Sequence, residues 1–403
     1  ATAPLGWEFD GWSGDVTSTD NPLAVTLAAD MSVTATFTEI SHPDGILAIG
    51  SDWDLRDALE YSKNNSQVSR ILLTDVGPYV PAEESRLEGK MPPLDITQTI
   101  EILGADTLSG KPAIRGYTSS TGGTSSEGFF RLRMGGNLTL KSLFIDGFMD
   151  GATAPAKYLI RADDSDNMGF HASFRAFNVD FKSTKEVLFK NYPSAFIDSL
   201  IMDACTVEDI GKEVLFFNSV GDADLIQVTN STFKRVGREV LYMKNMDPVV
   251  ILDHLTIENC GIGYGTEGDK FGAVRLQDGT TNVTFTNSII ANVTNTSNGY
   301  ALRIAGENSY LDNILLHNSP TRVDTYDDAM RGPDVFWYDP MFADVGAENY
   351  TLGDDSYAYH LQNDESAAIG DLRWATSTNV TAYAAMELMV DGPGMVELSP
   401  LPS

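Results

Sequence analysis

Three glutamates recur in a repeated short motif and could act together on a glycosidic bond. The motif reads Lys-Glu-Val-Leu-Phe twice and Arg-Glu-Val-Leu-Tyr once, and its glutamates are Glu186, Glu213 and Glu239. If they face outward in one column of stacked strands, neighbours lie about 5 Å apart and alternates about 9.6 Å apart. The first separation suits a retaining glycosidase, and the second lies at the upper limit for an inverting one. The motif therefore favours hydrolysis by paired carboxylates.

A column of long, mostly basic side chains accompanies these glutamates. Aligning the repeats places one such residue in each repeat, and the set is Arg133, Arg161, Lys190, Phe217, Lys244, Arg275 and Arg303. Met243 is an alternative to Lys244 in this column. Stacked like charges repel one another unless anions lie beside them. Either Asp163, Asp164 and the three glutamates neutralise the column, or a groove binds a polyanionic glycan through its sulfates or carboxylates, onto which arginine forks.

Three further residues are candidates for contact with a sugar. His171 follows an acidic loop at 163–167, which could bind calcium, supply an acid or base, or be an ordinary solvated loop. Tyr242 ends the third copy of the glutamate motif, and Tyr264 lies in a glycine-rich segment and could stack on a sugar ring. The sequence indicates no zinc site, phosphate loop or Ser-His-Asp constellation. We predict no metal ligands and no required cofactor, with Ca²⁺ as an option.

Stacked strands must position these side chains. Asparagines that follow or interrupt strand-like runs recur at intervals of 29, 28 and 31 residues, at Asn230, Asn259, Asn287 and Asn318. A period near 28 residues without a helical half favours a β-solenoid over a leucine-rich repeat. The asparagines would then form a ladder of stacked amides at one turn.

The two cysteines are expected to be buried free thiols. Cys205 and Cys260 each lie beside the asparagine position of a repeat, two repeats apart. Strands stack about 4.8 Å apart, so the two thiols would lie about 9.6 Å apart, which is too far for a disulfide.

Two elements are expected before the repeats. Residues 51–61 predict a short helix, because Ser51 or Asp52 can cap it and its apolar residues share a face. Residues 7–38 show strand alternation and turn chemistry. Their segments Phe-Asp-Gly-Trp-Ser-Gly-Asp-Val and Thr-Ala-Thr-Phe resemble the internalin-B type repeat of bacterial surface proteins. This resemblance implies a small β module that acts as a spacer or adhesive.

The repeats at 45–340 resemble the pectate-lyase-like β-helices of secreted Bacteroidota polysaccharide-utilisation proteins, and the resemblance extends through 334–342, 349–352 and 370–374. It implies an all-β fold: a single-stranded right-handed parallel β-helix with an N-terminal capping helix and a small N-terminal β module. We predict three domains, with residues 1–40 as the β module, 41–345 as the β-helix and 346–403 as a C-terminal cap or tail.

A lyase is the alternative to a hydrolase. Glu239, Lys244 and Arg275 resemble a pattern in β-helix lyases of the chondroitinase-B and alginate-lyase type. That resemblance implies Glu239 as a calcium ligand, Lys244 as the base and Arg275 as the acid of a β-elimination. The setting expected for hydrolysis, a β-helix with a cationic column, resembles that of β-helix endo-hydrolases of sulfated algal polysaccharides, including endo-fucanases.

Charge and composition bound the remaining possibilities. The chain of 403 residues has 57 acidic and 27 basic residues, so its net charge is 27 − 57 = −30. This acidity argues against nucleic acid or an anionic membrane as a partner. The chain begins without Met, so we expect either a removed signal peptide or an excised segment of a secreted or cell-surface protein.

The sequence predicts a secreted, monomeric endo-acting depolymerase of an anionic polysaccharide. Hydrolysis of a sulfated, fucan-like polymer is favoured, and elimination on a uronate polymer is the alternative. A non-catalytic glycan-binding or adhesive module is the third possibility.

Overall fold

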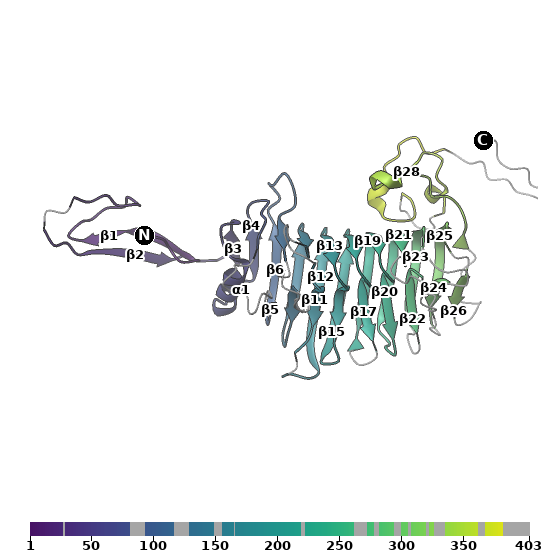
Figure 1. The fold of residues 1–403 in the computed structure, drawn as a ribbon, viewed down its shortest axis with the longest axis horizontal. Helices are drawn as coiled ribbons and strands as arrows, with labels where there is room; N and C mark the ends of the chain where they lie inside the picture. The colour runs from purple at the N-terminus through teal and green to yellow at the C-terminus, as the bar shows by residue number, and fades with distance from the viewer. Residues whose placement is uncertain are drawn as a thin grey trace, which may run out of the picture.

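The body of the molecule is a parallel β-helix, in which successive turns of the chain stack along one axis (Figure 1). Its turns build a 16-stranded and a 9-stranded sheet, and the strands within each sheet are parallel. The predicted all-β parallel-strand fold is confirmed. The computed structural model describes residues 1–26, 29–80, 93–116, 129–148, 155–164, 166–218, 222–261, 272–277, 282–293, 300–304, 308–319, 322–325, 335–361 and 367–381.

The 16-stranded sheet has a main path and a side branch. The main path contains β3 (Ile46–Ile49), β4 (Arg70–Leu73), β6 (Thr99–Gly104), β9 (Asn137–Lys141), β12 (Phe170–Phe177), β15 (Ala195–Asp203), β19 (Leu225–Val236), β21 (Val249–Cys260), β23 (Val283–Ala291), β25 (Tyr310–His317) and β27 (Val335–Phe336). The side branch contains β7 (Ala113–Arg115), β10 (Phe144–Asp146), β13 (Asp180–Thr184) and β16 (Thr206–Ile210). A short strand, β18 (Asp222–Ala223), pairs with β15. The branch rejoins the main path because β19 pairs with β15 through its first half and with β16 through its second.

The 9-stranded sheet forms the remaining face of the β-helix. It contains β5 (Leu94–Ile96), β8 (Phe130–Leu132), β11 (Tyr158–Ala162), β14 (Val187–Asn191), β17 (Leu215–Asn218), β20 (Leu241–Lys244), β22 (Val274–Gln277), β24 (Tyr300–Ile304) and β26 (Arg322–Thr325).

Alternating side chains fill the interior of the β-helix. In β9, for example, Leu138 and Leu140 are buried and their neighbours are partly exposed. Three fully buried phenylalanines from successive turns, Phe174, Phe189 and Phe217, stack with 5.7 Å between neighbouring ring centroids. Each such buried side chain contributes about 1.5–3 kcal/mol of burial free energy. This interior fixes the register of the outer face, since a slip of one residue would turn apolar side chains outward.

Two columns of residues with left-handed backbone turn the chain at the corners. The first contains Ala204, Asn230, His254, Asn287 and Asn313, and the second contains Asp209, Arg235, Asn259, Asn292 and Asn318. Within each column amides bond along the axis, as Asn313 Nδ2 donates to Asn287 Oδ1 at 3.0 Å and Asn318 Nδ2 to Asn292 Oδ1 at 2.7 Å. The predicted ladder of amides is present, but its single column is wrong. The turns of the β-helix differ in length, so an alignment at the asparagines combined residues from two different corners.

The cysteines are buried free thiols, as predicted. Burial raises the pKa of both thiols, that of Cys205 to about 12. Their expected homologous positions are wrong, however. Cys205 follows the first corner column and Cys260 follows the second.

One helix, α1 (Leu55–Asn64), precedes most of the β-helix. Asp54 caps it by accepting a hydrogen bond from the Arg56 backbone N–H at 2.9 Å, so the expected caps at Ser51 or Asp52 are wrong. Its buried face includes Leu55 and Leu59 and packs toward β3 and β5. In the described part of the chain, no helix has the length and apolar character needed to cross a membrane.

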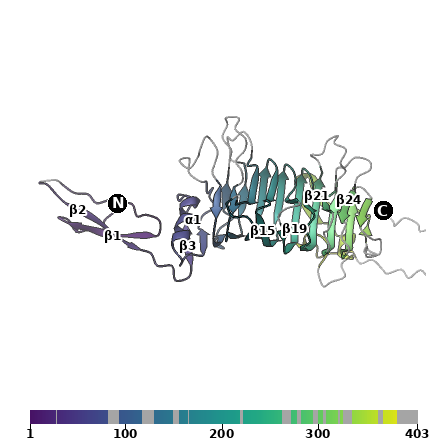
Figure 2. The ribbon, with the colours of Figure 1, turned by 90° about the horizontal axis from the view of Figure 1, so that it is seen from below.

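The N-terminal module is a two-stranded antiparallel sheet of β1 (Trp7–Gly14) and β2 (Val33–Glu39). The ring of Phe9 packs against Trp12 and Phe37, with centroids 5.4 and 5.8 Å away. Figures 1 and 2 show the module extending beyond the end of the β-helix at which α1 lies.

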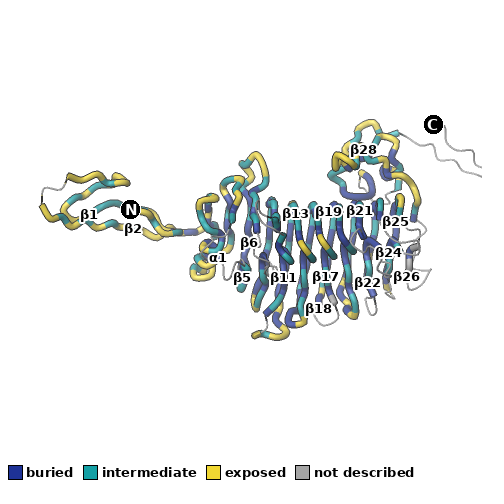
Figure 3. Tube along the Cα trace, viewed as in Figure 1, coloured by how far each residue is buried: buried dark blue, intermediate teal, exposed yellow. Residues whose placement is uncertain are grey.

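A C-terminal unit folds back over the 16-stranded sheet (Figure 3). It contains β28 (Phe342–Asp344) and β29 (Asn349–Leu352), with the 3-10 helices η3 (Val345–Ala347), η4 (Tyr357–Tyr359) and η5 (Leu372–Trp374). Arg373 anchors it by donating to the carbonyls of Ala204 and Cys205 at 2.9 and 2.7 Å. Asp371 accepts a hydrogen bond from Thr232 Oγ1 at 2.6 Å.

Candidate functional site

One residue from each of seven adjacent strands forms a column along the outer face of the 9-stranded sheet. We call this column the track, and strand pairing places in it Arg131, Arg161, Lys190, Phe216, Tyr242, Arg275 and Arg303. The side chains before and after each of them point inward, as Leu215 and Phe217 do on either side of Phe216. Strands about 4.8 Å apart give the track a length of about 29 Å.

Four track residues were predicted, and three predicted members are wrong. Arg133 and Lys244 lie two residues beyond Arg131 and Tyr242, so they share the outer face but belong to the next column. Phe217 is fully buried inside the β-helix. The errors arise because the interval between track residues is not constant. It is 26 residues from Phe216 to Tyr242 (242 − 216) and 33 from Tyr242 to Arg275 (275 − 242).

The predicted column of three glutamates is also wrong. Phe189 pairs with Leu215, so Glu186 is level with Lys212 and not with Glu213. The carboxylate of Glu186 contacts Lys212 Nζ at 3.2 Å and Lys157 Nζ at 4.0 Å. Glu213 and Glu239 do occupy adjacent turns, because the Val214 N–H donates to the Glu239 carbonyl at 3.0 Å.

The centre of the track is a continuous stack of charged and aromatic groups. Lys190 Nζ lies 3.5 Å from the centroid of the Phe216 ring. Phe216 and Tyr242 stack with centroids 5.1 Å apart and an interplanar angle of 21°. The guanidinium carbon of Arg275 then lies 5.1 Å from the Tyr242 centroid. Cation–π attraction orients both cations, and the ring edges leave an amphipathic surface of the kind that contacts sugars.

Lys190 is the most chemically distinctive group of the track. Burial lowers its pKa from 10.5 to about 8, an effect that the charges of Glu213 and Glu186 only partly oppose. Among the described residues no carboxylate forms a salt bridge with its amine. Tyr192 lies nearby, with its ring centroid 5.7 Å from Lys190 Nζ, and burial raises the pKa of its phenol. An amine with a pKa near 8 is partly neutral at physiological pH and can accept a proton.

Carboxylates neutralise the N-terminal part of the track. Arg131 forms a two-pronged pair with Asp95, with its Nε 2.6 Å from Oδ1. Arg161 Nη1 lies 3.5 Å from Asp163 Oδ2. In the neighbouring column Arg133 Nη2 bonds Asp164 Oδ1 at 2.9 Å, which holds the pKa of that carboxyl well below its usual range. The expected pairing of cations with Asp163 and Asp164 is therefore present.

The two stacked glutamates are buried against arginines. The Glu213 side chain is 5% exposed and lies 3.3 Å from Arg238 Nη1. The Glu239 side chain is 0% exposed, and its Oε1 lies 3.8 Å from Arg275 Nη1. Strands on adjacent turns stack about 4.8 Å apart, which is close to the separation of about 5 Å that a retaining hydrolase needs. The burial of the two carboxylates, however, places them below the surface that a polymer would contact.

The remaining candidates lie apart from the track or outside the described residues. His171 is on β12 of the 16-stranded sheet, where its Nδ1 lies 2.5 Å from Asp198 Oδ1. Asp198 is the extra residue of a β-bulge between β12 and β15, which turns its carboxylate toward the imidazole. The imidazole is 64% exposed. Tyr264 lies outside the described residues.

The donor set does not fit the implied calcium site. Within the described ranges, no three His, Cys, Asp or Glu side chains are grouped so that they could hold a metal ion. Glu239, the implied calcium ligand, instead contacts Arg275.

Sequence reasoning named Tyr242 as a sugar contact but missed Phe216 and the stack that the two rings form. Phe216 and Tyr242 are the final residues of two copies of the glutamate motif, and they follow a buried leucine in each case. Alternation from that leucine would place both rings on the outer face, but the same rule misplaces Phe189, which ends the first copy and is fully buried.

Comparison with protein families identifies the N-terminal module. Residues 1–41 match the model of the divergent InlB B-repeat domain, which confirms the repeat expected there. A search of curated proteins found no match to the chain.

Proposed function

We propose that the track binds an acidic polysaccharide extended along the axis of the β-helix. The observation that carries the proposal is the in-register column of five cations and two aromatic rings, one residue per strand. A repeating polymer presents similar groups at regular steps, and a column with one side chain about every 4.8 Å can contact successive units. Arginine supplies forked hydrogen bonds to carboxylate or sulfate, and the edges of the two stacked rings supply apolar contact.

The charge balance of this face favours a uronate polymer over a densely sulfated one. Arg131, Arg161 and Arg275 already have carboxylates beside them. A ligand anion must compete with those carboxylates, and a dense row of sulfates would also meet their repulsion. A polymer with one carboxylate per sugar fits the mixed face better. The sulfated fucan expected from the sequence is therefore the second candidate ligand.

We further propose that the bound polymer is cleaved by β-elimination at Lys190. The neutral amine would remove the proton at C5 of a uronate, and the C5–H electrons would form the C4=C5 double bond as the C4–O4 bond breaks. Arg161, one strand away, adds positive charge beneath this site and would make the C5 proton more acidic through its field, because its side chain is only 5% exposed and lies beside Asp163. The phenol of Tyr192 stays protonated because its pKa is raised, so it can donate to the departing O4 oxygen.

Hydrolysis by Glu213 and Glu239 is the second candidate chemistry. Their adjacent turns support it, and their burial counts against it. A non-catalytic binding protein is the third candidate, and it requires the track alone.

An assay on four polymers separates these functions. The protein is incubated with pectate, alginate, chondroitin and fucoidan, and unsaturated products, reducing ends and gel mobility are followed. We expect ultraviolet absorbance from unsaturated uronate on pectate or alginate, and its loss in Lys190→Ala. The matched control is Lys141→Ala, which removes a lysine from the 16-stranded sheet. Reducing ends without new absorbance, abolished by Glu213→Gln, would establish hydrolysis instead, and a mobility shift alone would establish a binder. No shift and no product with any polymer would refute the proposal.

A further inference from the structure

We infer that the N-terminal end of the track is closed by a pocket that receives the sugar residue at one end of the polysaccharide chain. This inference rests on the proposed function, because it assigns an end to the binding track. It goes beyond that function, because a track alone would bind any internal stretch of a polymer.

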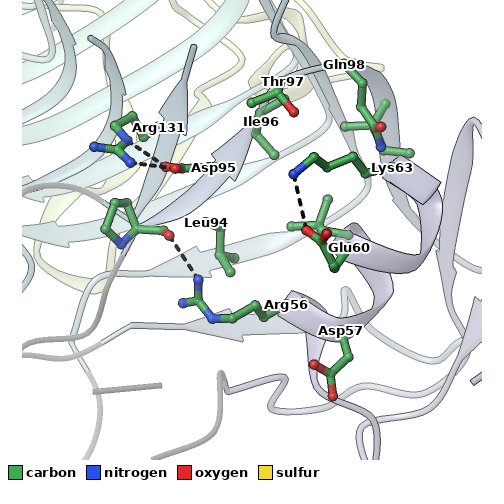
Figure 4. A pocket seen from close by; sticks show the side chains of 13 residues that line it. Arg56, Asp57, Glu60, Lys63, Leu94, Asp95, Ile96, Thr97, Gln98 and Arg131 are labelled. Carbon is green, nitrogen blue, oxygen red and sulfur yellow. Dashed lines mark hydrogen bonds and ion pairs between the residues drawn. The ribbon is translucent and has the colours of Figure 1, made fainter. Parts of the chain in front are cut away.

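The pocket lies between α1 and the first strand of the 9-stranded sheet (Figure 4). It has a volume of about 430 Å³, which is within the range of small-molecule sites. Its lining includes Arg131, the first residue of the track, and Asp95, with which Arg131 pairs. The pocket is therefore continuous with the track through these two side chains.

Helix α1 stops the track at this point. The 9-stranded sheet begins at β5, and α1 packs beside that strand where a further strand would otherwise extend the sheet. The helix contributes Asp57, Glu60 and Lys63 to the pocket. A polymer that follows the track toward β5 thus meets the helix, and the pocket is the space left for its last unit.

The chemistry of the lining suits the hydroxyl groups of a sugar. Three cations (Arg56, Lys63 and Arg131) and three carboxylates (Asp57, Glu60 and Asp95) line the pocket, so their charges cancel. The cations are partly engaged, because Lys63 Nζ lies 3.4 Å from Glu60 Oε2 and Arg56 Nη1 donates to the Pro93 carbonyl at 3.0 Å.

Gln98 adds an oriented amide to this lining. Its Nε2 donates to Ser62 Oγ at 2.7 Å, which leaves the side-chain carbonyl as an acceptor for a hydroxyl donor. Such a lining can bond several hydroxyl groups at once, and Arg131, at the border with the track, can meet the carboxylate of a terminal uronate. The pocket therefore fits one terminal sugar, whereas the track fits the anionic chain behind it.

The number of protein molecules bound per chain tests this inference. Calorimetric titration uses two probes, an oligogalacturonate just long enough to cover the track and a pectate fraction several times longer. The pH is held well below the pKa of Lys190 so that the chains stay intact. We expect one protein per chain with both probes, because each chain has one end of the correct kind. A stoichiometry that rises in proportion to chain length would overturn the inference.

Variants of the pocket make the test independent of the track. Thr97→Trp fills the pocket, and Gln98→Ala removes the oriented amide and is the gentler change. We expect Gln98→Ala to weaken binding about tenfold, as loss of one well-placed hydrogen bond does. We expect Thr97→Trp to weaken the binding of both probes more than this, because the last sugar loses its pocket while α1 still stops the track. The matched control is Thr139→Trp, at a partly exposed position on β9.

The failures of the two proposals are distinguishable. If the unsubstituted protein binds neither probe, the proposed function itself fails. If it binds both in proportion to length, and Thr97→Trp changes nothing while Arg303→Ala weakens binding, the track stands and the end pocket is refuted.

Discussion

The protonation state of Lys190 has opposite effects on the proposed binding and the proposed cleavage. Its ammonium form attracts an acidic polymer, whereas its neutral form is the one that accepts a proton. The Phe216 ring 3.5 Å from its Nζ excludes water and contributes to the burial that lowers its pKa to about 8. A lysine on an open surface would be almost fully charged at that pH.

We expect the two activities to respond oppositely to pH. Cleavage should increase as the pH rises through about 8, because the fraction of neutral amine grows, and binding should weaken over the same range. Initial rates and dissociation constants measured at a series of pH values check this. Lys190→Arg keeps the charge and removes the base, so it should retain binding and lose cleavage by at least about a hundredfold. A cleavage rate that falls as the pH rises through this range would contradict Lys190 as the base.

At the scale of elements, the register of the strands determines which of the predicted residues lie in the track. Arg161, Lys190, Arg275 and Arg303 lie in the track as predicted, because the sequence alignment was correct locally around each of them. Glu186 lies one residue away from the position that pairs with Glu213. In a strand, a shift of one residue moves a side chain to the opposite face of the sheet. The alternation of buried side chains was readable from sequence, but the length of each connecting loop was not.

The corner columns show the same limit. Asparagine tolerates left-handed backbone, and this made the asparagines recognisable as turn residues. The sequence carried no sign that two corners use the same residue type. His254 and Arg235 stand in the columns where the pattern would suggest asparagine, so the spacing of asparagines alone could not separate the corners.

We expect Asn287→Ala to destabilise the β-helix by about 2 kcal/mol. Asn287 has a φ of 48°, its Nδ2 donates to Asp253 Oδ1 at 3.0 Å and its Oδ1 accepts from Asn313 Nδ2 at 3.0 Å. Alanine loses both bonds and keeps the strained backbone. Asn287→Gly loses the bonds but relieves the strain, so its loss should be smaller, about 1 kcal/mol. Urea unfolding measures both, and equal losses would show that the backbone conformation contributes nothing.

At the scale of the whole molecule, ion pairs fasten the C-terminal unit to the β-helix. Lys234 Nζ lies 2.7 Å from Glu208 Oε2 and 2.5 Å from Glu348 Oε2, so it bridges the two parts. Burial alone would raise the pKa of Glu208, but hydrogen bonds from Lys182 and Lys234 lower it to about 2. The pKa of Glu348 is lowered as well, chiefly by its hydrogen bond from Lys234.

We expect acid to release the C-terminal unit. A carboxylate with a lowered folded-state pKa stabilises the fold above its unfolded value of 4.5, and that stability is lost as the pH falls toward about 2. Release exposes Trp374, whose indole Nε1 bonds Thr232 Oγ1 at 2.8 Å, so its fluorescence should shift to the red in this window. The change is identified by difference against Trp374→Phe. Glu208→Gln should detach at higher pH, and an unshifted midpoint in that variant would exclude Glu208 as an anchor.

The net charge of −30 describes the molecule as a whole and not the face that we propose as functional. On that face Arg131, Arg161 and Arg275 each lie beside a carboxylate, so acids partly offset the cations of the track. The overall acidity therefore does not by itself exclude a polyanionic ligand at the track.

The position of α1 has a consequence for how the protein behaves in crowded solution. A parallel sheet that ends in an open strand offers unpaired backbone groups to any other strand, and such edges seed fibrous aggregates. Packed beside β5, α1 covers that edge of the 9-stranded sheet at the N-terminal end. Helix α1, which we propose ends the track at the pocket, therefore also hinders the end-to-end polymerisation of β-helices.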